Sequence, residues 1–421
     1  MNLDLEQLPH SCSVLVIGAG PAGSAAATTL ARGGLDVVLV DQHVFPRDKV
    51  CGDGLIPDAH HALRKLGVLD EVMTQARRST HVRCVGPRGG CIDVPGELAV
   101  LPRKQLDDIV CRGAVAAGVR MHAPVRFVST LEEGGVVVGA RLEHAGAVRE
   151  LRAAWVILAT GAVPQALISA GMSERQTPSG VALRGYVRNL RMVERIRMLE
   201  VVWHRALTPG YGGIFPCADG VFNIGVGIAD SHVRGRTGRR AMAPANLRTV
   251  MEDFQSVYAP ARELMSDGEL LGPMKGAPLR CTLEGARFSR AGLLVAGEAA
   301  GSTYSFTGEG IGKALETGIL AAEALLAAPV PIDRATPAGA QLDERVRRDY
   351  ESRLAALKPR FELYRRANVV NRHPWLTDLL IWRAQRSARI VQRMSGVLEE
   401  TSNPGNLVSL KGIARLFLDR H

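Results

Sequence analysis

The sequence predicts an α/β protein, α+β overall, in which a Rossmann-like domain is interrupted by an antiparallel β-sheet and followed by C-terminal helices. Three observations predict this fold class. A buried strand, a glycine-rich turn and a helix occupy residues 13–32, and a similar strand and helix return at residues 292–326. Between them, residues 180–230 have the residue pattern of strands rather than of helices. The length of 421 residues allows one to three domains.

The first strand and helix belong to a complete βαβ unit. The apolar run 13–17 is typical of a buried parallel strand, residues 24–32 predict a helix, and residues 36–40 predict a second strand. Gly18, Gly20 and Gly23 have the spacing G-x-G-x-x-G between the first strand and the helix. In a dinucleotide site these glycines permit a tight turn, close approach of the backbone to a pyrophosphate, and close packing of helix on strand, respectively.

The helix start and the end of the second strand complete this pattern. The helix start at Ser24 offers free N–H groups and a partial positive charge that favour phosphate. Asp41 follows the second strand and can accept hydrogen bonds from a ribose diol. A 2′-phosphate there would meet a carboxylate, so we expect a nucleotide without one.

The segments in between alternate in character. Residues 55–75 and 103–117 predict helices, and residues 119–160 predict short strands separated by glycine turns. Strands of the antiparallel sheet are predicted at residues 181–187, 199–204 and 221–228.

A second glycine-rich element precedes the predicted helix 310–326. It contains Gly297 and Glu298, and then Gly308, Glu309, Gly310 and Ile311. A helix that begins there can direct backbone N–H groups at the edge of an electron-rich ring and stabilise negative charge on it. Residues 328–340 contain three prolines and predict a linker.

Composition limits the possible partners. The chain carries 52 Lys+Arg and 42 Asp+Glu, and 16 of those cations against 9 of those anions lie in residues 341–421. Aromatic residues make up 5% and form no basic, aromatic-interleaved stripe, which argues against nucleic-acid binding. A GC-rich coding bias toward arginine is the ordinary explanation of the charge, and contact with a membrane surface is the functional one.

The C-terminal region is compatible with both explanations of the positive charge. Trp375 and Trp382 precede arginines whose spacing of three and four places them on one helix face: Arg383, Arg386, Arg389 and Arg393. The region is interpreted either as packed helices with a solvated face or as a shallow membrane contact.

Cysteine usage and hydropathy indicate a cytoplasmic protein. Seven cysteines without a C-x-x-C pair argue against a disulfide framework and against a metal site. Residues 1–10 hold two acids and no Lys or Arg, unlike a signal peptide. No run of 18 apolar residues predicts a membrane span, so we expect cytoplasmic localisation, with peripheral membrane contact left open.

Four segments together resemble one protein family. They are GAGPAGS at 18–24, RDKVCGDG at 47–54, YGGIFP at 211–216, and GEAAG with FTGEGI between 297 and 311. In this order they resemble the geranylgeranyl reductase family, which belongs to the wider group of flavoproteins similar to para-hydroxybenzoate hydroxylase. The resemblance covers residues 14 to about 326 and implies FAD as cofactor.

The resemblance also implies the roles of individual residues. The first glycines and Asp41 would hold the ADP half of FAD, the 47–54 segment would lie beside the flavin, and residues 308–311 would face its pyrimidine side. The implied cofactor-binding residues are Gly18, Gly20, Pro21, Ala22, Gly23, Asp41, Arg47, Lys49, Cys51, Gly52, Arg103, Thr160, Gly161, Gly297, Glu298, Gly308, Glu309, Gly310 and Ile311. The implied substrate-binding residues are Tyr211, Phe215 and Pro216.

The predicted domains follow from these roles. Residues 1–75, 101–165 and 280–330 are expected to form a discontinuous FAD-binding domain. Residues 76–100 and 166–279 are expected to form a β-rich substrate domain, and residues 341–421 a helical region.

The sequence departs from the family pattern at four places. Glu298 replaces the usual Asp, Ser305 replaces a common Pro, and Gly213 stands where an aromatic residue is common and enlarges the cavity. Residues 159–164 lack the Asp-Gly motif associated with pyridine-nucleotide use. The electron donor is therefore open between NAD(P)H and another donor, such as an electron-donor protein.

The predicted function is hydride transfer from reduced flavin to a small hydrophobic substrate, a prenyl or polyene compound. The alternatives are an FAD-dependent monooxygenase that hydroxylates an aromatic or prenylated secondary metabolite, and a flavin-binding protein without turnover. The W-x-W-x-I-P segment of flavin halogenases is absent. Cys51 is the candidate catalytic residue, since a protonated thiol can donate a proton; a small buried side chain is the alternative interpretation.

Overall fold

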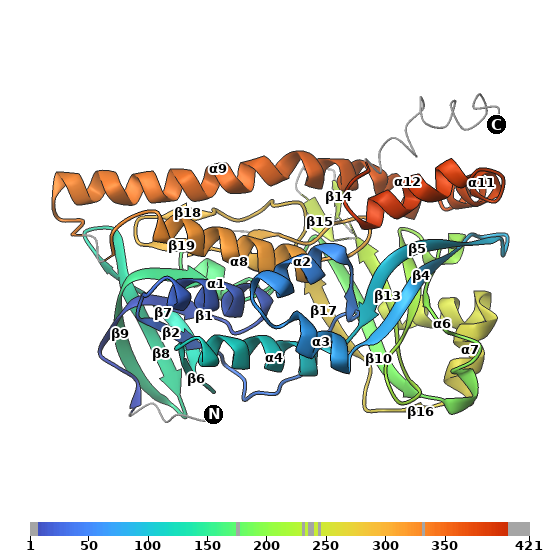
Figure 1. Cartoon of the computed structure of the whole chain (residues 1–421), viewed down its shortest axis with the longest axis horizontal. Helices are drawn as coiled ribbons and strands as arrows, with labels where there is room; N and C mark the ends of the chain where they lie inside the picture. Colours follow the sequence, from blue (N-terminus) through green and yellow to red (C-terminus); the bar gives the residue numbers. More distant parts are fainter. Residues whose placement is uncertain are drawn as a thin grey trace.

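The computed structural model describes residues 7–173, 177–229, 232–234, 240–242, 246–330 and 333–402. Two sheets lie side by side along the long axis of the molecule, and helices cover them (Figure 1). The part of the predicted helical region beyond residue 402 lies outside the described residues.

The first sheet contains the Rossmann-like core. Its strand order is β18-β19-β9-β1-β2-β6, and the strands from β19 to β6 are parallel. The bounds are β1 Ser11–Ile17, β2 Val37–Val40, β6 Arg120–His122, β9 Ala147–Leu158, β18 Ser289–Arg290 and β19 Leu293–Val295.

Both faces of this sheet are buried, as the continuous apolar strands predict. Val14 and Val16 of β1 pack beneath helices α1 and α8, whereas Leu15 and Ile17 pack against an antiparallel extension of the sheet. That extension comprises β7 Arg126–Glu133 and β8 Val136–His144, with β8 paired to β9. The helices of these layers are α1 Pro21–Arg32, α4 Arg103–Ala116, α5 Gln165–Ser169 and α8 Ile311–Leu326.

The second sheet has the order β16-β10-β13-β12-β11-β4-β5-β3, with β17 also paired to β10. It is antiparallel as predicted except between β4 and β11, which pair in parallel. These two strands come from distant segments, so no hairpin sets their direction. The bounds are β3 Gly54–Leu55, β4 Arg77–Val85, β5 Cys91–Val100, β10 Gly180–Arg188, β11 Leu199–Val202, β12 Gly210–Pro216, β13 Val221–Ala229, β16 Glu269–Leu270 and β17 Lys275–Leu279.

Shorter elements surround this sheet. Phe254 and Leu264 fill the core under two helices, α6 Leu247–Val257 and α7 Ala259–Ser266. A separate pair of strands, β14 His232–Arg234 and β15 Arg240–Met242, forms a small hairpin. Short 3-10 turns lie at Leu190–Met192, Arg205–Leu207 and Gly297–Ala300.

The helix predicted over 55–75 is two helices, α2 Pro57–Lys65 and α3 Leu69–Gln75. Gly67 lies between them with a φ of +71°, a left-handed conformation that ends an α-helix. The sequence pattern missed this break because the apolar spacing continues on both sides of the glycine.

The C-terminal helices are α9 Pro337–Ala367, α10 Val369–Arg372, α11 Trp375–Ala384 and α12 Ala388–Leu398. In Figure 1, α9 runs along one edge of the molecule and α11 and α12 lie near β4 and β5. The linker predicted over 328–340 was wrong in its second half. The Thr336 side chain accepts a hydrogen bond from the Gly339 N–H and Pro337 occupies the first turn, so α9 starts there.

In the part of the chain that the structure describes, no helix combines the length and the hydropathy needed to cross a bilayer.

Candidate active site

A cavity of about 790 Å³ extends from the turn after β1 to the C-terminal helices. Residues of both sheets line it. At one end lie the carboxyl ends of β1, β2 and β9, where open α/β sheets bind ligands. At the other end the lining is apolar.

The glycine turn after β1 is shaped by close backbone contacts. A Cβ atom on Gly18, whose φ is +102°, would lie 2.4 Å from the Ala159 carbonyl oxygen, and one on Gly23 would lie 1.8 Å from the Gly18 oxygen. A Cβ on Gly20 would meet only the ends of the Arg47 and Arg103 side chains, at 3.4 and 3.9 Å. The backbone at Gly20 is therefore open to a ligand, and two guanidinium groups flank that opening.

Asp41 is held at the end of β2 by backbone donors. Its carboxylate accepts hydrogen bonds from the Ala19 and His43 N–H groups, each at 2.9 Å. The Arg47 Nε lies 3.6 Å from the same carboxylate. The charged form of Asp41 thus lines the cavity beside the glycine turn, where the ribose of a dinucleotide is expected.

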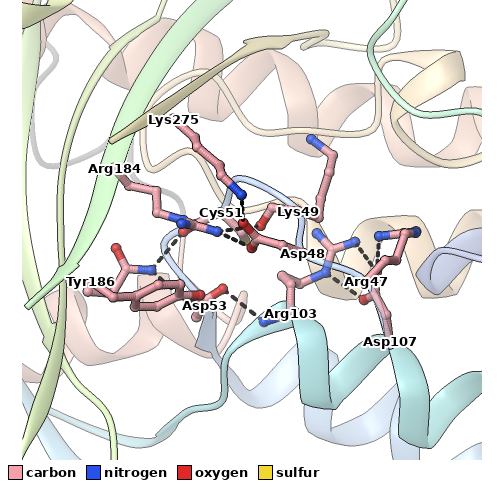
Figure 2. A network of polar contacts seen from close by, with 11 residues as sticks. Arg47, Asp48, Lys49, Cys51, Asp53, Arg103, Asp107, Arg184, Tyr186 and Lys275 are labelled. Atoms are coloured by element: carbon pink, nitrogen blue, oxygen red, sulfur yellow. Dashed lines mark hydrogen bonds and ion pairs between the residues drawn. The ribbon is translucent and has the colours of Figure 1, made fainter. Parts of the chain in front are cut away.

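Asp107 of α4 holds the two arginines in place. It is fully buried, accepts a bidentate pair of bonds from Arg103 at 2.6 and 2.9 Å, and lies 2.9 Å from Arg47 Nη1. Figure 2 shows both guanidinium groups turned toward this carboxylate. Two guanidinium groups are thus fixed beside the opening at Gly20, where they can donate hydrogen bonds to a pyrophosphate.

The segment that follows β2 is tied to the second sheet. The Asp48 carboxylate pairs with Arg184 of β10 and, at 2.7 Å, with Lys275 of β17 (Figure 2). Arg184 is buried against the Tyr186 ring, 4.2 Å from its centroid. Lys49 also lines the cavity.

Asp53 organises the loop that contains Cys51. Its φ is +64°, and its carboxylate accepts bonds from the Arg103 N–H at 3.1 Å, the Tyr186 hydroxyl at 2.6 Å and the Asn223 amide at 2.7 Å. Burial raises the pKa of Asp53 to about 6 in spite of these donors. Three donors from separate elements therefore fix this loop.

Cys51 and Gly52 line the cavity on this loop. The Asn223 amide donates to the Cys51 carbonyl oxygen at 2.8 Å, and burial raises the pKa of the Cys51 thiol, so the thiol keeps its proton near neutral pH. A Cβ on Gly52 would lie 3.1 Å from the Phe215 ring.

The second glycine-rich element closes the cavity from the other side. Gly297, with a φ of +67°, packs so closely on α1 that a Cβ would lie 2.5 Å from the Ala22 Cβ. Residues 307–311 run along the cavity into the first turn of α8, and the Tyr211 hydroxyl donates to the Thr307 carbonyl oxygen at 2.5 Å. Glu298 lines the cavity nearby and accepts a bond from the Thr303 hydroxyl at 3.3 Å.

Strand β12 contributes alternate residues. Tyr211, Gly213 and Phe215 line the cavity, whereas Pro216 is buried and does not. On the other face, a Cβ on Gly212 would lie 2.6 Å from the Phe254 ring. Successive residues of a strand point to opposite faces. The structure therefore places Pro216, which was predicted to bind substrate, away from the cavity.

Most of the other predicted site residues gather at the cavity. Gly23 and Gly297 do not line it, and act through packing instead. The predicted residues that line it are Gly18, Gly20, Pro21, Ala22, Asp41, Arg47, Lys49, Cys51, Gly52, Arg103, Thr160, Gly161, Glu298, Gly308, Glu309, Gly310, Ile311, Tyr211 and Phe215.

The apolar end of the cavity was missed by the sequence analysis. Strands β4, β5 and β11 form one wall, and the C-terminal helices form the other. The helical wall consists of Ala367, Val370, Thr377, Leu380, Ile381, Met394, Val397 and Leu398. The Trp203 indole donates to Asn371 at 2.8 Å and joins the walls. The C-terminal region had been interpreted as packed helices or as a shallow membrane contact, and in neither case as a wall of the cavity.

The residues present fit FAD on structural grounds. Gly20 leaves space beside two arginines, and the Thr160 and Thr307 hydroxyls lie enclosed at the cavity without hydrogen-bond partners. Enclosed polar groups of this kind are normally satisfied, here by a ligand. The length of the cavity also fits FAD, because the cavity continues from the dinucleotide end past Cys51 to Tyr211.

The fold and this site define a flavin-dependent oxidoreductase. The family model described as "FAD binding domain" matches residues 11–230. The chain belongs to this family of FAD-binding proteins and, within it, to the geranylgeranyl reductases.

Curated relatives support this placement, and a solved structure shows the same fold. Menaquinone reductase of Mycolicibacterium smegmatis is 35% identical over 74% of this chain and 75% of its own, and digeranylgeranylglycerophospholipid reductase of Methanosarcina mazei is 30% identical over 74% of each. A geranylgeranyl bacteriochlorophyll reductase-like protein from Thermoplasma acidophilum shares the fold, with a TM-score of 0.68 at 21% identity over 98% of this chain and 97% of that one.

Proposed function

We propose that this protein reduces a carbon–carbon double bond of a prenylated lipid or quinone. The observation that carries the proposal is the cavity, which joins a dinucleotide site to a long apolar arm. The names of the relatives support the substrate class, since they denote reductases of a menaquinone and of a digeranylgeranyl lipid.

The chain's own residues perform four tasks in this proposal. The β1–α1 turn, Asp41, Arg47 and Arg103 bind the cofactor. When bound, FAD supplies the hydride after reduction. The start of α8 follows the cavity-lining residues 307–311, and its free N–H groups and partial positive charge would stabilise negative charge there.

The remaining tasks concern the substrate. Tyr211, Phe215 and Trp203 form the wall where the cavity narrows to its apolar arm, and they keep water from the reacting bond. The arm between β4, β5 and the C-terminal helices accepts the prenyl chain, because an apolar lining matches a ligand without polar groups.

A further part of the proposal concerns access. Trp375 and Trp382 of α11 are 58% and 43% exposed, while Leu380 and Ile381 of the same helix line the cavity. We propose that this helix touches an anionic lipid surface and that the substrate enters beside it. Co-sedimentation with vesicles that contain phosphatidylglycerol tests this, and equal recovery of native protein and W375S/W382S with the vesicles contradicts it.

The test of function uses FAD-loaded protein reduced anaerobically with dithionite. Mixing with menaquinone or a digeranylgeranyl lipid should reoxidise the flavin and give a product with two more hydrogens, as measured by mass spectrometry. A parallel reduction with NADH, NADPH or a reduced ferredoxin identifies the electron donor.

The same experiment examines the monooxygenase alternative. Mixing the reduced protein with oxygen and substrate would then give a product with one more oxygen atom. Turnover only with oxygen, and none without it, would overturn the reductase proposal.

A further inference from the structure

Glu309 occupies a position that the cofactor-binding role does not explain. It lines the cavity in the segment 307–311, immediately before the first turn of α8. Its Oε2 atom is enclosed by protein and has no hydrogen-bond partner. The Tyr211 hydroxyl, which approaches the same segment, donates to the Thr307 carbonyl oxygen instead.

Other acids surround Glu309 on the side away from the cavity. Asp58 of α2 and Glu400, which follows α12, both interact with it, and Tyr211 and Tyr364 also lie close enough to interact electrostatically. The buried cation of this cluster, Lys313 of α8, is 2% exposed and already pairs with three other carboxylates, Asp58 at 3.6 Å, Glu316 at 2.5 Å and Glu400 at 2.9 Å. A second cation, Arg360, pairs with Glu400.

This environment favours the neutral acid. Burial, and then the charges of Asp58 and Glu400, raise the pKa of Glu309 to about 8, whereas the Thr307 hydroxyl and then Lys313 lower it by less. Burial with so little compensation favours the protonated form of a carboxyl. Near pH 7 the cavity therefore contains a protonated acid.

We propose that Glu309 is the catalytic proton donor of the reduction. The inference rests on the proposed function. One alkene carbon receives the hydride supplied by reduced flavin, and the other carbon receives the proton of the Glu309 carboxyl. The C=C π bond breaks, two C–H bonds form, and Glu309 becomes a carboxylate.

The cluster beside Glu309 reaches the surface. Glu316, whose side chain is 34% exposed, pairs with Lys313. Glu309 suits the role better than Cys51, since the most effective donor has a pKa near the working pH and burial raises the thiol pKa away from it.

The test compares E309Q with C51S and with E323Q, a change near the other end of α8. E309Q keeps the shape of the side chain but has no acidic proton. We expect kcat to fall on the order of 100-fold or more in E309Q, with FAD still bound, and to stay near the native value in E323Q. In native protein, kcat should fall above about pH 8, and this fall should vanish in E309Q.

A second readout does not depend on turnover. The infrared difference spectrum on flavin reduction should contain the C=O band of a protonated carboxyl in native protein and C51S, and should lack it in E309Q. Native kcat and pH profile in E309Q would overturn the donor assignment and leave the proposed function intact. Absence of any substrate reduction by the native protein would overturn the proposed function and the donor role with it.

Discussion

Adding a methyl group at Gly20 and adding one at Gly23 should have different effects, the first on cofactor binding and the second on folding. A Cβ on Gly23 collides with the Gly18 backbone, whereas one on Gly20 meets only two flexible arginine side chains at normal distances. The second glycine of this pair is therefore required by the fold, and for the first we predict a requirement by the ligand.

We predict that Gly20→Ala folds normally but loses FAD. The melting temperature of the apoprotein should match that of native protein, while FAD affinity falls on the order of tenfold or more, because the methyl group occupies the approach to the pyrophosphate. Fluorescence titration with FAD measures the affinity. Gly90→Ala, where the Cβ would lie 3.6 Å from Ile381, is the control. Native affinity in Gly20→Ala would show that no phosphate binds there.

Asp107 compensates the buried Arg103 and the partly buried Arg47. We predict that Asp107→Asn lowers the free energy of unfolding by about 3–5 kcal/mol, since it leaves Arg103 without its carboxylate and Arg47 with Asp41 alone. The neighbouring Asp108→Asn removes only a partly exposed ion pair with Arg112 and should cost less than about 1 kcal/mol. Urea unfolding of the apoproteins compares the two, and equal losses would contradict this account.

Secondary-structure elements were predicted well wherever the local pattern determines them. The βαβ unit, the helix at α4 and the strands β10 and β13 agree closely with the sequence analysis. The errors have local physical causes, namely the left-handed Gly67 between α2 and α3 and the Thr336 cap at the start of α9. The i,i+4 pair of Arg103 and Asp107 was also readable from spacing.

Contacts between distant elements were beyond sequence reasoning. Asp48 pairs with Arg184 and Lys275, which lie more than 100 residues away in sequence, and no motif links them. The alternation of β12 was readable, but which of its faces meets the cavity depends on the helices that cover the other face. The apolar arm depends likewise on how α10 to α12 fold back over the second sheet.

At the scale of elements, α12 should set the length of the substrate. We predict that Met394→Trp, which places a larger side chain into the apolar arm, raises KM for a long prenyl substrate roughly tenfold and leaves a short one unchanged. Gln392→Trp on the exposed side of the same helix is the control. If Met394→Trp changes KM for long and short substrates equally, or changes neither, the prenyl chain lies elsewhere.

At the scale of the whole molecule, Lys313 joins parts of the chain that are far apart in sequence. It links α2, α8 and the segment after α12 through Asp58, Glu316 and Glu400, and Glu400 also accepts a bond from Tyr304 at 2.8 Å. The same cluster lies beside Glu309. Its charges therefore affect both the stability of the protein and the protonation of Glu309.

This cluster makes the stability of the protein depend on pH. Burial first, and neighbouring acids among the further causes, raise the pKa values of Asp58 to about 7 and of Glu309 to about 8. These values lie above those of the unfolded chain, so the folded protein retains protons that the unfolded chain releases. Stability from these groups is therefore complete below about pH 4 and is lost as pH rises to about 8.

We predict that Lys313→Met makes this dependence steeper. Without the ammonium group, Asp58 and Glu316 lose their cation and Glu400 keeps only Arg360, and the variant should lose about 3–5 kcal/mol in mildly alkaline solution. The loss should be smaller near pH 6, because Asp58 and Glu309 then take up protons. Lys65→Met is the matched control, since Lys65 forms an exposed pair with Glu323 between the same two helices and should cost less than about 1 kcal/mol at either pH. Urea unfolding at about pH 6 and about pH 9 measures the four values. A pH-independent loss in Lys313→Met would mean that the acids near Glu309 are ionised throughout this range, and would also contradict the neutral carboxyl on which its catalytic role depends.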